Sequence, residues 1–150
     1  MRDFDRPLAP RGRRAAPRIA TWLLRKDYVP DLVLCSAAKR AVETWDRLRT
    51  ALAHDAEVQL LHDLYAAQPA RILDIVRGRG GDAESVLVIG HNPGMHELAH
   101  HVVHDGPAAD LRRLRQKFPT AAAAVIDFDI DQWPDAQLGR LTAFIRPKDL

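Results

Sequence analysis

The stretch "VLVIGHNPGM", residues 86–95, decides the fold that we expect for this chain. Four apolar residues run into a glycine, as is typical of a strand buried on both faces, and they predict a strand over residues 85–90. Asn92 is a good N-cap and Pro93 a good first helical residue, so a helix is expected to begin there. His91 is therefore expected at the turn between a buried strand and a helix N-terminus.

The rest of the chain alternates in the same way. Apolar side chains after the turn follow helical spacing: Met95, Leu98, Ala99, Val102 and Val103. Further helices are expected over residues 10–26, kinked or delayed by Pro17, over 37–52, and from Pro69. Strands are expected over 31–36 and 57–61, with a closing antiparallel pair over 121–130 and 139–147. This order predicts a three-layer αβα fold with a mostly parallel sheet.

The composition limits the class of protein. The 150 residues are 47% hydrophobic and 28% charged, as in one soluble globular domain spanning residues 1–150. No apolar run approaches the roughly 20 residues that span a bilayer, and no signal peptide is visible, so no membrane partner is expected. The single cysteine, Cys35, excludes an intramolecular disulfide framework and fits a reducing cytoplasm.

The first part of the chain is rich in arginine, although the net charge is only +2. Asp3 and Asp5 lie among these arginines and offset part of their charge. Nucleic-acid binding is therefore not expected, and a solvated basic face or a rim that attracts small anions is favoured. The arginines concerned are Arg2, Arg6, Arg11, Arg13, Arg14 and Arg18.

Two strand-to-helix turns share a chemical logic, because helix N-termini and the carboxyl ends of parallel strands both favour anions. His91 precedes one helix. Ser36 is expected to cap the other, and Arg40 follows in its first turn. A cation at a helix N-terminus costs about 0.3–1 kcal/mol, which is easier to understand if an anion sits there. The alternatives are a structural, hydrogen-bonded His91 and an ordinary surface Arg40.

Two motifs compete with this interpretation. "HELAH", residues 96–100, matches the zinc-protease pattern H-E-x-x-H, but the chain offers no suitable third ligand. His96, His100 and His104 are expected on the solvated outer face of the helix, and a metal-dependent hydrolase stays the weaker alternative. "CSAAKR" has four residues between Cys35 and Arg40, one fewer than the cysteine phosphatase loop, so Cys35 is expected to be a small buried residue.

Several segments together resemble the histidine phosphatase superfamily, in its SixA-type phosphohistidine phosphatase branch. "VLVIGHNPGMHELA" is similar to the second-histidine motif of that branch. "LVLCSAAKRAVETW" resembles its strand followed by S-x-x-x-R-A-x-x-T. "DRPLAPRGRRAA" and "FIRPKDL" resemble the segment after its first strand and its usual ending. The resemblance covers essentially the whole chain.

The resemblance implies a phosphoglycerate-mutase-like fold that hydrolyses phosphohistidine on a protein, or a small phosphomonoester, without metal or cofactor. His91 and Arg40 would be catalytic groups around the phosphoryl oxygens. Ser36, Asn92 and Arg6 are further substrate-binding candidates. Asp63, near the segment "HDLYAA", is a possible general acid, and a solvated loop residue is its alternative reading.

The chain departs from the family at the nucleophile. The first histidine of the family ends a central strand in an R-H-G or R-H-A motif, and neither motif occurs here. Neither His54 nor His62 follows an apolar strand into a glycine turn. We therefore expect no turnover by the chain as written, with the first strand missing. The strands expected over 31–36 and 85–90 would then either close on one another or leave a slot. A phosphate-binding or phosphoprotein-binding module without activity is the alternative function.

Overall fold

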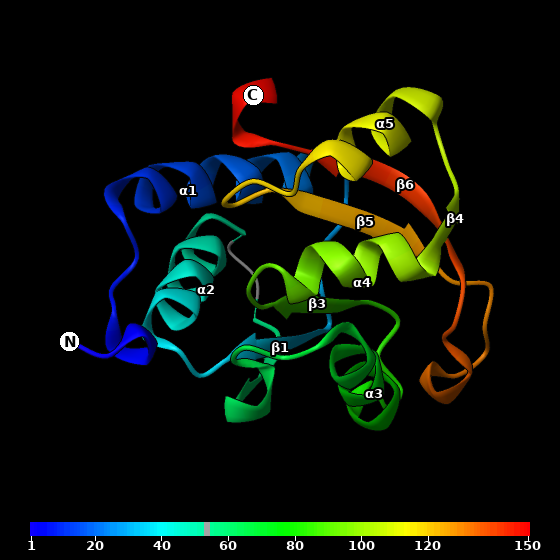
Figure 1. Ribbon diagram of the computed structural model, residues 1–150, viewed down its shortest axis with the longest axis horizontal. Helices are drawn as coiled ribbons and strands as arrows, with labels where there is room; N and C mark the ends of the chain where they lie inside the picture. Colours follow the sequence, from blue (N-terminus) through cyan, green and yellow to red (C-terminus); the bar gives the residue numbers. More distant parts are fainter. Residues whose placement is uncertain (53–54) are drawn as a thin grey trace. The chain divides into compact units, whose positions relative to one another are not determined.

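The structure, a computed structural model, describes residues 1–52 and 55–150, so His54 lies outside the described residues (Figure 1). The chain forms two compact units. The first consists of Met1–Tyr65, Ala83–Gly90 and Leu150, and the second of Ala66–Asp82 and His91–Asp149. Whether the chain behaves as one domain stays a prediction. Among the described residues, no helix is long and apolar enough to cross a membrane.

The first unit is built around a parallel sheet of β1 (Leu32–Ser36), β2 (Glu57–Leu61) and β3 (Val86–Ile89). The strands are ordered β2-β1-β3, with β1 in the centre. All five residues of β1 are buried, as the apolar run predicted. A central strand of a parallel sheet is covered on both faces, which explains why it carries no alternation of polar and apolar residues. The predicted α/β fold with a parallel sheet is confirmed.

β1 and β3 are direct neighbours in this sheet. Leu32 lies opposite Val86 and Cys35 opposite Ile89, and the pairing is parallel throughout. No other strand lies between them among the described residues. Direct pairing gives partners to the backbone N–H and C=O groups on the facing edges, each of which is costly to bury alone. No slot therefore separates β1 from β3, and the expectation that the chain lacks a strand stays a prediction.

Two long helices complete the first unit, α1 (Pro10–Arg25) and α2 (Lys39–Leu52), which lie side by side (Figure 1). Their buried faces consist of small and apolar residues: Ala15, Ala16, Ile19, Ala20 and Leu23 on α1, and Ala41, Trp45, Leu48 and Leu52 on α2. The helix begins at Pro10 as predicted, so of the two effects expected from Pro17 inside it, a kink or a delayed start, the delayed start is not observed. Proline at the first helical position costs no backbone hydrogen bond.

The second unit contains α3 (Pro69–Arg79), α4 (Gly94–Val102) and α5 (Ala108–Gln116). Its sheet has the order β4-β6-β5, from β4 (Val103–Asp105), β5 (Ala123–Asp127) and β6 (Gly139–Ile145). The predicted antiparallel pair is confirmed as β5 and β6. The core of this unit comprises Ala99, Leu114, Leu141 and Phe144.

α5 and β4 were not predicted from the sequence. Val103 was placed on the apolar stripe of a helix, but it begins β4, which pairs in parallel with β6. A strand of three residues carries too little pattern to be recognised, and its pairing with β6 spans more than thirty residues of chain. α5 buries only Leu114, so its apolar stripe is too narrow to stand out from its charged residues.

Candidate functional site

The carboxyl ends of the three parallel strands lie along one edge of the first sheet. Ser36 at the end of β1 is opposite Leu61 at the end of β2, and Cys35 is opposite Ile89 near the end of β3. The segments that follow the strands therefore start from the same edge, which is where open α/β sheets bind ligands. Asp63 lies in the short helix η2 (His62–Leu64), directly after β2, and is exposed.

Ser36 shapes the turn that leads to Arg40. Its side chain is fully buried, and its Oγ accepts a hydrogen bond from the backbone N–H of Ala38 at 3.2 Å. α2 begins at Lys39, two residues later than expected, because the chain completes this turn first. A local bond of this kind is typical of serine before a helix. The structure thus shows Ser36 as a residue that positions the turn, and its predicted contact with substrate stays a prediction.

Arg40 binds the N-terminal segment of the same unit. Its Nη1 donates to the backbone oxygen of Asp3 at 2.8 Å, and its Nη2 donates to Oδ2 of Asp3 at 3.1 Å. The guanidinium carbon also lies 5.9 Å from the ring centre of Tyr65. Only 19% of the Arg40 side chain is exposed. The ordinary surface arginine that was the alternative reading is therefore not what the structure shows.

Three side chains among the described residues bind the carboxylate of Asp3. Besides Arg40, the Tyr65 hydroxyl donates to Oδ2 at 2.6 Å, and Arg6 donates to Oδ1 through Nη2 at 3.2 Å. The Tyr65 hydrogen bond is the largest influence that lowers the pKa of Asp3, and Arg6 and Arg40 lower it further. The same hydrogen bond raises the pKa of Tyr65. Arg6 and Arg40, both predicted anion ligands, thus converge on one anionic group.

A hollow of about 420 Å³ adjoins these groups and is lined by Arg2, Asp3, Phe4, His62 and Tyr65. The Phe4 and His62 rings stack with their centres 5.0 Å apart. The Phe4 and Tyr65 rings pack edge to face, with their centres 5.1 Å apart. Phe4 belongs to the short helix η1 (Asp3–Asp5). Aromatic pairs of these geometries are favourable, so they anchor η1 beside Arg40.

His91 and Asn92 belong to the second unit. The side-chain N–H of Asn92 donates to the backbone oxygen of Phe118 at 2.6 Å, and Oδ1 accepts from the backbone N–H of His96 at 3.2 Å. Both ends of the Asn92 amide are therefore engaged in holding α4. The predicted cap is shifted by one residue, since Pro93 is the N-cap and Gly94 the first helical residue. The backbone oxygen of His91 accepts a hydrogen bond from Met95 at 3.0 Å.

The "HELAH" histidines do not all lie on a solvated face. Nε2 of His96 is 2.6 Å from the backbone oxygen of Leu114 and 3.1 Å from Nε2 of His100. The expectation for His96 was wrong, because α5, which the sequence analysis missed, covers it; His100 and His104 are exposed. In the described part of the chain, no three histidine, cysteine, aspartate or glutamate side chains are arranged to hold a metal ion.

Cys35 is buried as predicted. Its Sγ lies 3.3 and 3.4 Å from the backbone oxygens of Ser36 and Ala41, and burial raises the pKa of the thiol to about 12. A thiol with so high a pKa carries almost no thiolate near neutral pH and is a poor nucleophile. The interpretation of Cys35 as a small core residue is therefore confirmed by its burial.

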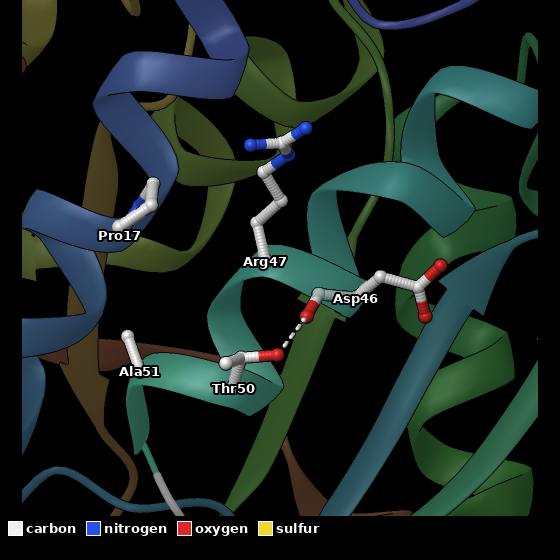
Figure 2. Close-up of a pocket in the computed structure, with 5 residues that line it drawn as sticks. All are labelled: Pro17, Asp46, Arg47, Thr50 and Ala51. Carbon is white, nitrogen blue, oxygen red and sulfur yellow. Dashed lines mark hydrogen bonds between the residues drawn. The ribbon is translucent and has the colours of Figure 1, made fainter.

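A second hollow, of about 360 Å³, lies between α1 and α2 (Figure 2). Its lining residues are Pro17, Asp46, Arg47, Thr50 and Ala51. The Thr50 hydroxyl donates to the backbone oxygen of Asp46, so it is engaged within its own helix. None of the predicted site residues lines this hollow, and Arg47 lies about two turns along α2 from Arg40. A substitution of Arg47 is therefore a suitable control for the same substitution of Arg40.

Sequence reasoning missed Asp3 and Tyr65 as partners of Arg40. Asp3 was read only as a charge among arginines, and Tyr65 was quoted in "HDLYAA" without a role. The Arg40–Asp3 contact spans 37 residues of chain and the Tyr65–Asp3 contact spans 62, so no local pattern indicates them. The position of Tyr65 four residues after the end of β2 is a signal in retrospect, since side chains that follow parallel strands collect at one edge.

These observations define an α/β protein whose charged side chains gather at the carboxyl edge of a parallel sheet. No model of a known protein family matches the chain. The protein MT1313 of Mycobacterium tuberculosis (strain CDC 1551 / Oshkosh) is 36% identical over 142 residues, which cover 91% of this chain and 85% of that protein.

Solved structures are similar over nearly the whole chain. SixA of Nakamurella multipartitia has a TM-score of 0.81 and 30% identity, and the match covers 98% of this chain and 88% of that one. SixA of Agrobacterium tumefaciens has a TM-score of 0.79 and 29% identity, and the match covers 98% and 87%. Both structures bear the name of a putative phosphohistidine phosphatase SixA. The chain belongs to the SixA-type histidine phosphatase family and has its mixed α/β fold.

Proposed function

We propose that this chain binds the phosphoryl group of a phosphohistidine-bearing protein, or of a small phosphomonoester, through Arg40 and His91. The observation that carries the proposal is the convergence of Arg40 and Arg6 on one carboxylate beside the strand ends of a parallel sheet. Guanidinium groups that already hold one anion have the charge and the donor geometry that phosphoryl oxygens require. Membership in the SixA-type family supports the same substrate class.

In the reaction that the family implies, a histidine nitrogen attacks phosphorus and the bond to the leaving group breaks. Water then hydrolyses the phosphoenzyme, which returns the histidine and releases inorganic phosphate. Arg40 and His91 would stabilise the charge on the phosphoryl oxygens during both transfers. Asp63, exposed after β2, is the candidate that would protonate the leaving group. Ser36 would act indirectly, by shaping the turn before α2.

We propose further that the 150-residue chain binds the phosphoryl group without turning it over. It contains no Arg-His-Gly or Arg-His-Ala motif to supply the attacking histidine. The alternative of a binding module without activity therefore describes the chain as written. The metal-dependent hydrolase is disfavoured because the ring nitrogen of His96 that would be a ligand lies 2.6 Å from the Leu114 carbonyl oxygen.

Binding is tested by calorimetric titration with inorganic phosphate and with vanadate. Arg40→Gln and His91→Ala should each weaken binding by about tenfold or more, since each removes a contact to the anion. Arg47→Gln is the matched control, because it removes the same charge from an exposed position of the same helix. Equal affinity for phosphate in Arg40→Gln and Arg47→Gln would refute the assignment of Arg40.

Turnover is tested separately with a phosphohistidine peptide and an aryl phosphate. We expect no release of phosphate above background. Release that His91→Ala abolishes would show that the chain is an active enzyme and that another group is the nucleophile.

A further inference from the structure

The anion site at Arg40 is occupied by the chain itself. Both terminal nitrogens of the guanidinium donate to Asp3, one to its backbone oxygen at 2.8 Å and one to its carboxylate at 3.1 Å. A phosphoryl group would need the same guanidinium N–H donors of Arg40 that Asp3 already occupies in this arrangement. Asp3 and a phosphoryl group are therefore alternative partners for one guanidinium.

The contact is more than a chance pair of surface charges. Tyr65 and Arg6 bind the same carboxylate, and Phe4 packs next to it on the rings of His62 and Tyr65. The Arg40 side chain is only 19% exposed, so it has little freedom to reach solvent elsewhere, whereas the Asp3 side chain is 53% exposed. The more exposed partner, Asp3, is thus the one that can leave.

We propose that Asp3 is an internal competitor that sets the specificity of the Arg40 site for dianionic tetrahedral oxyanions such as phosphoryl groups. This inference rests on the proposed function, in which Arg40 binds phosphate. A ligand with a single carboxylate only replaces the carboxylate of Asp3 at the guanidinium, so the exchange adds little binding free energy. A phosphoryl dianion brings more charge and more acceptor oxygens, so it gains from the exchange.

Two substitutions in the same short helix separate this effect from a change in overall charge. Asp3→Asn keeps the shape of the side chain but removes the charge that competes for Arg40. Asp5→Asn removes the same charge two residues away, where Asp5 pairs only with the exposed Arg2 in the described contacts. Tyr65→Phe keeps the ring beside Arg40 and removes only the hydroxyl that holds the carboxylate.

The measurement is calorimetric titration with inorganic phosphate, and with acetate as the monocarboxylate probe. Asp3→Asn should bind phosphate about three- to tenfold more tightly than the wild type, in keeping with a partly exposed ion pair, and should bind acetate measurably. Tyr65→Phe should give a smaller gain, and Asp5→Asn should match the wild type. Adding Arg40→Gln to Asp3→Asn should abolish the gain.

Each other outcome overturns the inference. If Asp3→Asn and Asp5→Asn have equal affinity for phosphate, Asp3 does not compete at the site, although Arg40-dependent binding by the wild type would still support the proposed function. A gain that survives Arg40→Gln would place the effect away from Arg40. If no variant binds phosphate, including Asp3→Asn, then the inference and the proposed function both fail.

Discussion

Gly94, the first residue of α4, lies directly against the backbone oxygen of Ala67, just before α3. A Cβ atom at position 94 would overlap that oxygen and would come within 3.2 Å of the Ile72 side chain. The obstacle is backbone, which moves far less readily than the end of a flexible side chain. The glycine of the "HNPG" motif therefore has a packing role that is separate from any contact with substrate.

Gly94→Ala should destabilise the protein by about 1–3 kcal/mol, because the added methyl group forces α4 away from the segment before α3. The urea midpoint of unfolding measures the effect. Gly78→Ala is the matched control, since a Cβ there meets nothing within 4 Å and the residue lies in α3. Alanine is the better helix former, so Gly78→Ala should gain about 0.5–1 kcal/mol. Similar midpoints for the two variants would contradict the packing role.

Cys35 should resist thiol reagents in the folded protein. Its side chain is buried, and its pKa of about 12 leaves very little thiolate at pH 8. The reaction with an aromatic disulfide reagent should follow the rate of unfolding and should become fast in concentrated urea. Fast labelling under native conditions would show that Cys35 is accessible from solvent.

The stability of the protein should decrease as the pH falls below about 6.5, with His100 as one cause. His100 is largely exposed, but partial desolvation of its ring is the largest influence that lowers its pKa from the ordinary value of 6.5, and the charges of His96 and Arg115 lower it further. The folded state then binds a proton less readily than the unfolded chain, so this contribution is complete above pH 6.5 and is lost on acidification. Urea melts between pH 5 and 8 measure it.

The control for this pH dependence is a second histidine. His100→Gln should reduce the loss of stability on acidification, because it removes the group whose pKa is lowered. His104→Gln, at an exposed position of β4, should retain the loss seen in the wild type. If both variants lose stability to the same degree as the pH falls, the effect does not arise at His100.

Removal of metal ions should change neither folding nor phosphate binding. Nε2 of His96 contacts the Leu114 carbonyl oxygen and Nε2 of His100. The two histidines are therefore not arranged as ligands of a zinc ion. Dialysis against a chelator should leave the thermal midpoint and the phosphate affinity unchanged. His96→Ala should nevertheless cost about 1–3 kcal/mol, because it leaves the Leu114 oxygen without this partner. A midpoint that falls on chelation and recovers with zinc would restore the metal hypothesis.

The secondary structure of the first unit was largely predictable from sequence. The apolar runs of β1 and β3, the proline that opens α1 and the spacing of Ala41, Trp45 and Leu48 on α2 are local signals, and each produced the expected element. Burial of a strand or of one helix face requires apolar residues at a short, regular period. Such a period can be recognised in a single sequence, and so can the position of Arg40 after a strand.

The tertiary structure alone decided which groups meet. The direct pairing of β1 with β3, the cover of α5 over His96, and the convergence of Asp3, Arg6 and Tyr65 around Arg40 all join residues far apart in the chain. Contacts of this kind depend on how loops close and on which partner satisfies each buried or charged group. No short, regular spacing of residues in the sequence indicates them. The sequence by itself therefore determined the strands, the helices and the candidate anion ligands, whereas folding determined that Arg40 already holds a carboxylate.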